Sequence, residues 1–404
     1  MNGAPEDLYQ KTPNSIVLYG TTWCPDCKQA KRFFGEHRVP YTNVDIEQDT
    51  RAMEFVVTLN HGKQIVPTIV FPDGTVLMEP SDAELAEKLG LQTKAKQEFY
   101  DAIVLGGGPA GLTAALYLAR EGQETLVIEK AAVGGQSGVT QALDNFPGFD
   151  EGIAGAEFAE RLARQTRRFG AEILEAQEVV SIIRQGGYLM VGTSSGANYC
   201  AKTALLASGA RYRRLGVPGE EELLGTSIHF CATCDGAFYK GKKVLVIGGG
   251  NSGFEEGLFL TRFASEVDIV EFEPEVKASR ILQDKVAEKV NMRVFTNHAV
   301  QEFTGESRLE TVVVQDRETG ATKEWRYDGV FVFIGLTPNS SLVAGQAELD
   351  AQGFVMTGAN LMTRVPGLFA AGDVRAGSTK QAVSAAGEGA AAALMMRDYL
   401  KEVG

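Results

Sequence analysis

Apolar runs and helical patterns alternate along the first part of the chain. The apolar run Ser15–Tyr19 predicts a buried strand, and a helical pattern follows over about Lys28–Arg38. A second strand is predicted at Tyr41–Ile46, a helix near Arg51–Asn60, and a further apolar segment at Ile65–Phe71. This alternation of strands and helices is typical of a small α/β unit.

Turn and cap signals complete this unit and mark where it ends. Asp73-Gly74 predicts a turn, and Ser81 followed three residues later by Glu84 predicts a capped helix over Ser81–Leu89. The polar segment Gln92–Glu98 shows neither period, so we expect it to be a linker.

A different pattern begins beyond the linker and occurs twice. The apolar strand Asp101–Leu105 leads into the glycine-rich loop Gly106–Gly111 and an alanine-rich helical stretch. The same order recurs at Lys243–Ile247, which leads into the loop Gly248–Gly253. This internal duplication of strand, glycine loop and helix predicts two dinucleotide-binding units of the Rossmann type.

Both loops have the G-x-G-x-x-G spacing in the strand-to-helix context that dinucleotide binding requires. The three glycines permit a tight turn, close approach of the backbone to a pyrophosphate, and close packing of helix on strand. The helix N-terminus then offers free N–H groups to the phosphates. The expected contact positions are Gly106, Gly108, Pro109, Ala110 and Gly111 in the first loop and Gly248, Gly250, Asn251, Ser252 and Gly253 in the second.

Acidic residues follow both loops at the spacing expected of ribose ligands. A carboxylate roughly 20 positions after the loop accepts hydrogen bonds from ribose hydroxyls. Glu129 holds this place in the first unit and Glu271 in the second. Near the C-terminus, the apolar segment Leu368–Val374 contains Asp373, which suits a carboxylate near the ribityl or phosphate part of a flavin. The alternative for Asp373 is an ordinary turn residue.

Length and charge restrict the classes of protein that fit. The chain has 404 residues, too many for one ordinary core, so two or three domains are expected. Its formal net charge of −13 argues against nonspecific binding to nucleic acid or to an anionic membrane. No apolar run reaches the ~18 residues of a membrane span, and the N-terminus lacks a secretory signal pattern. We therefore expect a cytoplasmic protein.

Four of the five cysteines form two CxxC pairs, Cys24/Cys27 and Cys231/Cys234. In a reducing compartment such pairs indicate catalysis or metal binding more often than structural disulfides. A shared zinc site is one alternative, but the pairs lie in separate predicted units, each with a redox context, so no metal is expected. The fifth cysteine, Cys200, precedes an apolar run and is expected to be a buried small hydrophobe.

The first pair is expected to react through Cys24. This residue would lie at a helix N-terminus, where the helix dipole stabilises a thiolate, while Cys27 would be the buried resolving thiol. Lys28 and Lys31 add positive potential, and the carboxylate of Asp26 opposes it.

A series of ordered motifs runs through the rest of the chain: Gly106–Gly111, Gly134–Gln136, Asp144–Gly148, Ala207–Ala210, Cys231–Gly236, Gly335–Asn339, Gly372-Asp373 and Lys380–Ala382. With these motifs, the chain from about Tyr100 to its end, about three-quarters of its length, resembles the low-molecular-weight thioredoxin reductases. The resemblance implies FAD in the first unit and a nicotinamide nucleotide in the second. It also implies further FAD contacts at Gly135, Gln136, Asn145, Gly372, Asp373, Lys380, Gln381 and Ala382.

The same resemblance assigns roles around the second cysteine pair. Cys234 would lie against the flavin, Cys231 would exchange electrons with the next disulfide, and Asp235 would donate or accept the proton. A structural turn is the alternative for Asp235. His229 lies two residues before Cys231, where it would either tune the thiolate or simply be an exposed residue.

The first 90 residues contain another set of motifs: Trp23–Cys27, Val66–Thr68, Phe71–Gly74 and Glu79–Ser81. With them this region resembles the glutaredoxins, and most closely the mycoredoxin type. The resemblance implies that Pro67 is cis and faces the CxxC pair, a minority state for X-Pro bonds. An ordinary trans proline is the alternative.

Together these features predict an α/β protein with a thioredoxin-fold domain followed by two Rossmann-like domains, the nucleotide domain being inserted in the FAD domain. The expected division is 1–91 for the glutaredoxin-like domain, 92–99 for the linker, 100–212 and 339–404 for the FAD domain, and 213–338 for the NAD(P)H domain with its CxxC pair. Hinges are expected near Arg211–Arg213 and Ile334–Pro338.

One departure from the thioredoxin reductase pattern bears on the nucleotide. Members that use NADPH carry a His-Arg-Arg cluster where this chain has Glu271–Glu275. A carboxylate ~4 Å from a doubly charged phosphate costs several kcal/mol, whereas it accepts a hydrogen bond from a free ribose hydroxyl. The segment 271–278 is instead similar to the NADH-using flavoprotein subunit of alkyl hydroperoxide reductase. We expect NADH rather than NADPH, although Lys277 and Arg280 are nearby cations.

The expected function is an FAD-dependent NADH:disulfide oxidoreductase. Electrons would pass from NADH through FAD and Cys231/Cys234 to Cys24/Cys27, and then to an acceptor disulfide in a peroxiredoxin or another redoxin. The alternatives are an NADPH-dependent thioredoxin or glutaredoxin reductase, a reductase of mixed disulfides with a low-molecular-weight thiol, and a redox sensor. A homodimer is expected from the resemblance.

Overall fold

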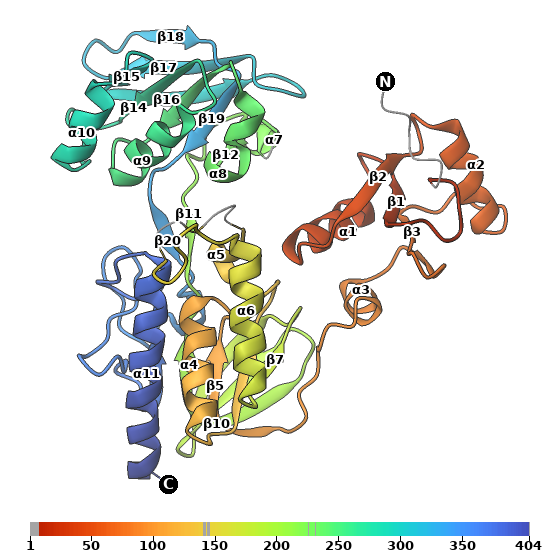
Figure 1. Ribbon diagram of the computed structural model, residues 1–404, viewed down its shortest axis with the longest axis vertical. Helices are drawn as coiled ribbons and strands as arrows, with labels where there is room; N and C mark the ends of the chain where they lie inside the picture. Colours follow the sequence, from red (N-terminus) through yellow and green to blue (C-terminus); the bar gives the residue numbers. More distant parts are fainter. Residues whose placement is uncertain (1–7, 140–142, 144–145, 225, 231, 404) are drawn as a thin grey trace.

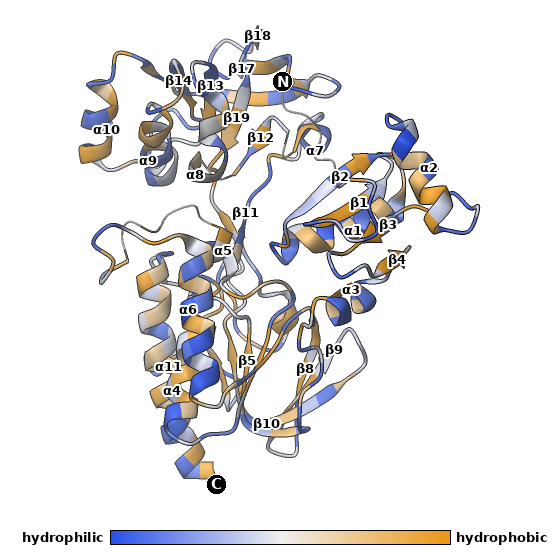
Figure 2. Cartoon of the chain, turned by 45° about the vertical axis from the view of Figure 1, so that its right-hand side comes forward, coloured by the Kyte–Doolittle hydropathy of each residue, from blue (hydrophilic) through white to orange (hydrophobic). Residues whose placement is uncertain are grey.

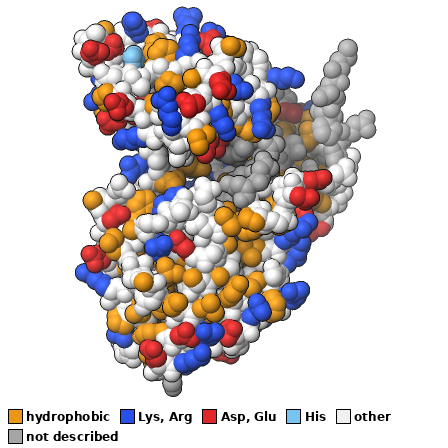
Figure 3. All heavy atoms as spheres, turned by 60° about the vertical axis from the view of Figure 1, so that its left-hand side comes forward, with side chains coloured by type: hydrophobic (Ala, Val, Ile, Leu, Met, Phe, Trp, Pro, Cys, Tyr) orange, Lys and Arg blue, Asp and Glu red, His pale blue; other side chains and the backbone are white. Residues whose placement is uncertain are grey.

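The computed structural model describes residues 8–139, 143, 146–224, 226–230 and 232–403. Two lobes lie one above the other, and the N-terminal region stands beside them (Figure 1). Charged side chains are spread over the upper lobe, while hydrophobic side chains gather on one face of the lower lobe (Figure 3). No helix in the described ranges is long and apolar enough to cross a membrane.

The N-terminal region is a four-stranded sheet with helices around it. The strand order is β2-β1-β3-β4, with β1 parallel to β2 and antiparallel to β3. Its elements are β1 (Ile16–Gly20), α1 (Pro25–Glu36), β2 (Tyr41–Asp45), α2 (Thr50–Leu59), β3 (Thr68–Val70), β4 (Val76–Met78) and α3 (Asp82–Lys88).

Two boundaries in this region differ from the predictions for identifiable reasons. Helix α1 begins at Pro25 instead of Lys28, because the Cys24 side chain caps the helix and proline suits its first position. Strand β3 begins only at Thr68, because Pro67 has no N–H to donate to a strand ladder. The predicted capping box is present, with Ser81 and Glu84 each accepting a hydrogen bond from the other's backbone N–H.

The lower lobe is built on a sheet of seven strands in the order β7-β6-β5-β10-β9-β8, with β21 paired to β10. Strand β5 is parallel to both β6 and β10, as a doubly wound unit requires. The elements are β5 (Phe99–Leu105), α4 (Pro109–Arg120), β6 (Thr125–Ile128), α5 (Gly135–Val139), α6 (Gly155–Arg168), β7 (Glu172–Leu174), β8 (Val179–Gln185), β9 (Tyr188–Thr193), β10 (Asn198–Leu206), β21 (Leu368–Ala370) and α11 (Ala382–Val403).

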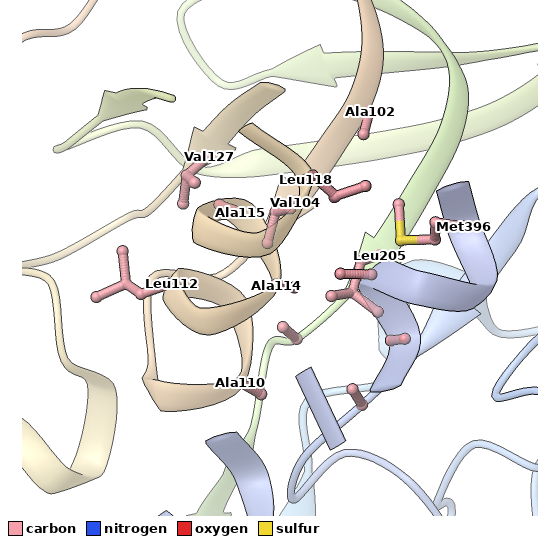
Figure 4. Close-up of a cluster of buried hydrophobic side chains, with 14 of the residues drawn as sticks. Ala102, Val104, Ala110, Leu112, Ala114, Ala115, Leu118, Val127, Leu205 and Met396 are labelled. Carbon is pink, nitrogen blue, oxygen red and sulfur yellow. The ribbon is translucent and has the colours of Figure 1, made fainter. Parts of the chain in front are cut away.

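Small side chains hold helix α4 tightly in this lobe. Ala114 and Ala115 on α4 are fully buried beside Val104 of β5, and Met396 of α11 reaches the same cluster (Figure 4). Gly389 of α11 lies so close to the backbone of α4 that a side chain there would collide with it. This packing fixes the start of α4, where the first glycine loop ends. Hydrophobic segments fill the interior of the lobe, and the outer face of α6 is hydrophilic (Figure 2).

The upper lobe has a parallel sheet in the order β12-β19-β13-β14-β15 and a separate antiparallel sheet, β16-β17-β18. Helices α9 and α10 pack on the parallel sheet through a shared apolar core. The elements are α7 (Glu220–Leu223), β12 (Ile228–His229), α8 (Ala232–Asp235), η1 (Gly236–Tyr239), β13 (Lys243–Ile247), α9 (Asn251–Leu260), β14 (Glu266–Val270), α10 (Arg280–Ala287), β15 (Met292–Phe295), β16 (His298–Thr304), β17 (Thr311–Asp316), β18 (Thr322–Trp325) and β19 (Gly329–Val332).

A two-stranded connection joins the lobes. Strand β11 (Ala210–Tyr212) enters the upper lobe and pairs antiparallel with β20 (Leu336–Pro338), which returns from it (Figure 1). Beyond β20, η2 (Ser341–Val343) begins the last stretch of the lower lobe. The upper lobe is therefore inserted in the lower one, and the predicted fold class is confirmed.

Candidate active site

The first glycine loop has the geometry of a dinucleotide cradle. Gly106 adopts a φ of +111°, which favours glycine, and a β-carbon on Gly111 would collide with the carbonyl oxygen of Gly106. An added β-carbon on Gly108 would meet no atom of the described residues within 4 Å. No side chain among the described residues caps α4, so the first N–H groups of the helix have no side-chain acceptor.

Segments that are distant in sequence converge on this loop. The N–H of Gly134 donates to the carbonyl of Gly107 at 2.6 Å, and a β-carbon on Gly135 would lie 3.5 Å from the Cα of Gly108. From the C-terminal part, Gly372 approaches Ala110 so closely that an added β-carbon would lie 3.0 Å from the Ala110 Cβ. The predicted contact positions Gln136 in α5 and Gln381 with Ala382 at the start of α11 belong to these same segments. Asn145 lies outside the described residues.

Glu129 lies at the end of β6 and is held by backbone N–H groups. Its carboxylate accepts hydrogen bonds from Gly107 at 2.6 Å and from Ala131 at 2.9 Å. Burial raises the pKa of Glu129, and the two N–H donors oppose that rise. The carboxylate is therefore fixed beside the loop, with lone pairs left for the hydroxyls of a ribose.

The Asp373 region supplies an unsatisfied polar group of the kind a cofactor would satisfy. Its Oδ1 atom is buried and finds no hydrogen-bond partner within the described part of the chain. Burial raises the pKa of Asp373, and nearby Lys380 opposes the shift. The Lys380 ammonium donates to the carbonyls of Asp373 at 2.7 Å and Arg375 at 3.0 Å. A buried acceptor beside an open glycine loop fits the hydroxyl-rich chain of FAD.

The second glycine loop has the same backbone conformation and the same glutamate contacts as the first. Gly248 has a φ of +122°, and a β-carbon on Gly253 would collide with the carbonyl oxygen of Gly248. Glu271 accepts hydrogen bonds from the N–H of Gly249 and, at 2.9 Å, from that of Glu273. These residues fit the ribose and pyrophosphate of a nicotinamide nucleotide in the way that the first loop fits FAD.

The chain following Glu271 folds back over this second loop. The N–H groups of Lys277 and Ala278 donate to the carbonyl of Gly249 at 2.9 and 3.0 Å. The side chain of Asn251 accepts from Ser279 at 2.7 Å, and the neighbouring Ser252 is exposed in the first turn of α9. The predicted contact residues of this loop are therefore brought together.

The cations near Glu271 are arranged differently from the sequence-based expectation. Arg280 is mostly exposed and forms an ion pair with Asp284 at 3.1 Å. Arg317, which the sequence analysis did not single out, donates to the carbonyl of Phe272 at 2.5 Å and stacks over its ring at 3.6 Å. Arg317 lies between β17 and β18, far from Glu271 in sequence, so no local spacing indicates it.

The N-terminal cysteine pair forms a compact site. The N–H of Cys27 donates to the Cys24 sulfur at 3.3 Å, and the Cys24 thiol donates to the carbonyl of Val66 at 3.5 Å. The peptide between Val66 and Pro67 is cis, so the predicted arrangement of Pro67 beside the pair is confirmed. Trp23, next to Cys24, is 63% exposed.

The two thiols of this pair differ in burial. Cys24 keeps 4% of its surface exposed and Cys27 none, so Cys24 is less accessible than predicted but remains the outer thiol. Burial raises the pKa of Cys27 to about 12, so it stays protonated at neutral pH. A β-carbon on Gly20 would lie 2.8 Å from the Cys27 sulfur, so this glycine makes room for it. The lone Cys200 is buried as predicted.

The surroundings of the second cysteine pair include a histidine that is not exposed. Cys231 lies outside the described residues, as does the side chain of Cys234, although its backbone belongs to α8. Asp235 in the same helix places its carboxylate 3.3 Å from Nδ1 of His229, whose Nε2 is 2.7 Å from the hydroxyl of Tyr239. His229 is only 6% exposed because β12 places it in the parallel sheet, so the prediction of an exposed residue was wrong.

A further titratable group lies near the connection between the lobes. Glu256 of α9 has a buried Oε2 atom with no hydrogen-bond partner among the residues described. Burial raises the pKa of Glu256 to about 7. Burial likewise raises the pKa of Tyr212 in β11, with the charges of Glu256 and Asp373 adding to the shift. Glu256 is a charged residue on helix α9, and neither its spacing nor its neighbours in sequence indicate that its carboxylate is buried.

Comparisons with known families agree with this geometry. Residues 100–389 match the pyridine nucleotide-disulphide oxidoreductases, and residues 16–77 match the glutaredoxins. The thioredoxin reductase of Bacillus subtilis (strain 168) is 39% identical over 310 residues, covering 76% of this chain and 97% of that protein. The bifunctional thioredoxin reductase/thioredoxin of Mycobacterium leprae (strain TN) is 40% identical over 309 residues, covering 76% of this chain and 67% of that protein.

Solved structures support the same assignment. The thioredoxin reductase of Lactococcus lactis in its FR conformation superposes with a TM-score of 0.69 at 34% identity, covering 75% of this chain and 99% of that one. The thioredoxin reductase of T. acidophilum gives a TM-score of 0.68 at 34% identity, covering 76% and 100% of the two chains. The chain therefore belongs to the pyridine nucleotide-disulphide oxidoreductase family, as a thioredoxin reductase-like flavoprotein that carries an N-terminal glutaredoxin domain.

Proposed function

We propose that this protein carries electrons from NADH to an external protein disulfide, and that its own glutaredoxin domain is the outlet. The observation that carries the proposal is the complete redoxin site in the same chain as both dinucleotide loops. Cys24 caps α1 beside the cis Pro67, with Cys27 buried behind it. The bifunctional relative, whose name joins thioredoxin reductase and thioredoxin, supports a built-in outlet.

The residues that would hold FAD are those that converge on the first loop. The glycine loop would take the pyrophosphate, Glu129 the ribose, and the Asp373 region the ribityl or phosphate part. When bound, FAD accepts a hydride from the nicotinamide and supplies an electron pair for disulfide reduction. The residues of the second loop would hold the nucleotide, with Glu271 at its ribose.

Thiol–disulfide exchange would then carry the electron pair along the chain. The Cys231 thiolate attacks the Cys24 sulfur of the Cys24–Cys27 disulfide and forms a mixed disulfide, with Cys27 leaving as a thiol after taking up a proton. Cys234 next attacks Cys231, which restores the Cys231–Cys234 disulfide and releases Cys24. The redoxin pair has gained two electrons and two protons, and the reductase pair is oxidised again.

The structure favours Cys24 over Cys27 as the thiol that meets partners. The pKa of about 12 for Cys27 keeps it a thiol at neutral pH, while Cys24 at the helix N-cap faces the positive end of the helix dipole. Reduced Cys24 would attack the acceptor disulfide, and Cys27 would resolve the mixed disulfide as its proton is removed.

We infer that Asp235 donates and accepts the proton of the Cys231/Cys234 thiols, and that His229 holds the Asp235 carboxylate in position. The 3.3 Å contact between the Asp235 carboxylate and Nδ1 of His229 fixes the carboxylate one residue after Cys234. The hydroxyl of Tyr239 holds the other ring nitrogen at 2.7 Å. This arrangement supports an acid–base role for Asp235 over a plain turn.

The case for NADH rests on Glu271. Its carboxylate is fixed by two backbone N–H groups at the place where a 2′-phosphate would bring like charge. The exposed cations Lys277 and Arg317 are the groups that would support NADPH instead. The expected acceptor is a peroxiredoxin or another redoxin in the cytoplasm, and the working form is a homodimer, for which the apolar face of the lower lobe in Figure 3 is available.

Replacement of Cys24 by serine tests the outlet directly. Under anaerobic conditions, C24S should show wild-type flavin reduction by NADH and lose at least about 100-fold in turnover with a peroxiredoxin disulfide, because the attacking thiolate is missing. The matched control is Cys200→Ser, which removes a buried thiol outside the pathway. Persistent acceptor turnover in C24S would show that Cys231/Cys234 reduces the acceptor alone.

A second candidate acceptor is a mixed disulfide with a low-molecular-weight thiol, which the glutaredoxin match supports. Such a substrate needs only Cys24 when the low-molecular-weight thiol is supplied in excess, because a second molecule of that thiol attacks the mixed disulfide on Cys24, forms a symmetrical disulfide and releases the Cys24 thiolate. Cys27→Ser should therefore keep most activity on a small mixed disulfide and lose activity on a protein disulfide. Equal loss on both would exclude the small mixed disulfide as the physiological substrate.

A further inference from the structure

The far end of helix α1 contacts the flavin-binding lobe. The carbonyl of Glu36, the last residue of α1, accepts a hydrogen bond from Ala132 at 3.1 Å. The guanidinium of Arg38 lies against Gly138 of α5, where it occupies the space that a side chain would need. Ala176, which follows β7, packs with the apolar core of the redoxin domain. Figure 1 shows this end of α1 directed toward α5.

Arg38 occupies a backbone position that favours glycine. Helix α1 ends in a Schellman motif, in which the N–H of Val39 donates to Phe34 at 2.8 Å and that of Arg38 donates to Gly35 at 3.1 Å. This motif requires a left-handed residue after the C-cap, and Arg38 has a φ of +54°. A non-glycine residue in that conformation is disfavoured. Outliers of this kind cluster at functional positions.

The guanidinium of Arg38 is poorly satisfied by the protein itself. Its Nε atom is buried without a hydrogen-bond partner, and it forms no ion pair with a carboxylate within the described part of the chain. Burial lowers the pKa of Arg38, and the nearby charges of Glu129 and Glu175 oppose that shift. A partly buried cation whose Nε–H has no partner among the described residues therefore lies close enough to Glu129 for their charges to interact.

We propose that Arg38 binds the adenosine diphosphate half of FAD across the domain boundary, so that the cofactor fastens the redoxin domain to the flavin lobe. The proposal rests on FAD binding at the first loop. Glu129 would accept from the ribose hydroxyls, while the planar guanidinium donates to phosphate oxygens or stacks on the adenine. This contact would give the Nε–H group of Arg38 a partner, and it would explain why an arginine occupies a backbone position that favours glycine.

This fastening would act at the end of α1 that lies opposite to the dithiol. Helix α1 has 12 residues, so its two ends lie about 18 Å apart. Cys24 caps the first end, and Arg38 follows the last. The cofactor would thus hold the redoxin domain by the end opposite to its reactive thiols, which remain free to meet another disulfide while the domain is docked.

The test begins with FAD-free protein and measures the affinities for FAD, ADP and FMN. R38M should weaken the binding of FAD and ADP by about tenfold or more, which is the usual effect of losing a hydrogen bond to a charged group. Its affinity for FMN should change less than twofold. R38G should show the same loss with an unchanged or raised melting temperature of the redoxin domain, because glycine suits the left-handed position. R32M, an exposed arginine on the same helix, is the matched control and should match the wild type.

Hydrogen exchange supplies a readout that does not depend on activity. In the wild type, protection of residues 36–39 should rise when FAD is added, whereas in R38G it should stay low with or without saturating FAD. Residues 131–138 should gain protection in both proteins, because this segment includes direct cofactor contacts of the first loop. Wild-type affinities in R38M and R38G, or protection of residues 36–39 that FAD does not change, would overturn the proposal while leaving the electron pathway intact. Failure of the wild type to bind FAD would overturn both.

Discussion

The two glycine loops use the same backbone device in different surroundings. In both, the third glycine packs on the carbonyl of the first, and a glutamate accepts from the N–H of the second loop residue. Two segments that are distant in sequence, at 134–135 and at 372, approach the first loop where α4 begins. Within the described part of the chain, the start of α9 in the second loop is covered by the local segment 277–279, while the backbone at 333–334 lies against Gly248 as that at 207–208 lies against Gly106. The difference suits a resident cofactor in one loop and a nucleotide that enters and leaves in the other.

The comparison also shows that the geometry of the loop alone does not determine which nucleotide binds. Glu129 and Glu271 have matching hydrogen bonds, yet burial raises the pKa of Glu129 while Glu271 lies among exposed charged residues such as Lys277 and Arg317. The choice between two nucleotides that differ by one phosphate must therefore come from the residues around the loop.

Blocking each loop in turn should separate their roles most strongly. Gly111→Ala places a β-carbon on the carbonyl of Gly106, so the purified protein should lose nearly all FAD, as measured by its visible absorbance. Gly253→Ala makes the matching collision with Gly248. This variant should keep FAD and lose at least about 100-fold in the rate of flavin reduction by NADH. The opposite pattern would exchange the assignments of the two loops.

Changing the carboxylate of the second loop should sharpen the nucleotide choice. Glu271→Gln should lower the rate of flavin reduction at limiting NADH by about tenfold and raise that with NADPH, because removing one charged hydrogen-bond partner costs about 1.5–3 kcal/mol. The exposed Glu275→Gln is the control. Stopped-flow absorbance measures both nucleotides. A wild type that already prefers NADPH would show that Lys277 or Arg317 holds the phosphate.

The His229 contact predicts a smaller kinetic effect. His229→Gln should slow electron transfer from the flavin to the Cys231–Cys234 pair about three- to tenfold and shift its pH profile, because Asp235 loses its positioning partner. Tyr239→Phe, which keeps the imidazole contact to Asp235, should have a weaker effect. An unchanged pH profile in His229→Gln would mean that the histidine has only a packing role in the sheet.

The buried carboxylate of Glu256 should make stability depend on pH. The pKa of Glu256 in the folded protein, about 7, lies above its value in the unfolded chain. Its contribution to the free energy of unfolding is therefore fully present below about pH 4.5 and is lost as the pH rises through 7. Relative to the wild type, Glu256→Gln should raise the free energy of unfolding by up to about 2–3 kcal/mol at pH 8 and change it little at pH 4.5. Thermal melts at the two pH values measure this, with the exposed neighbour Glu255→Gln as control. Equal gains at both pH values would exclude titration as the cause.

Local signals predicted much of this molecule. The strand at Lys243–Ile247, the capping box of Ser81 and Glu84, and both glycine loops lie where the sequence places them, because each depends on neighbouring residues. The prediction that His229 is exposed was wrong, because its burial depends on β12 joining a sheet with β19, about 100 residues away.

The residues that sequence reasoning missed share the same cause. Arg317 reaches Phe272 from a turn between two later strands, Glu256 is buried within charge range of Tyr212 in the connection between the lobes, and Arg38 contacts Gly138 in a different domain. None of these contacts has a spacing signature. Arg38 alone leaves a trace, since an arginine stands where the end of a helix favours glycine, but the sequence does not show that the position is left-handed.

The most direct test of the electron pathway is differential alkylation of the redoxin pair after one anaerobic addition of NADH. In the wild type, Cys24 and Cys27 should change from a disulfide to two alkylated thiols, as read by mass spectrometry. In Cys231→Ser, the flavin should still be reduced while Cys24 and Cys27 remain a disulfide. Reduction of Cys24 without Cys231 would contradict the pathway, because electrons would then reach the glutaredoxin domain by another route.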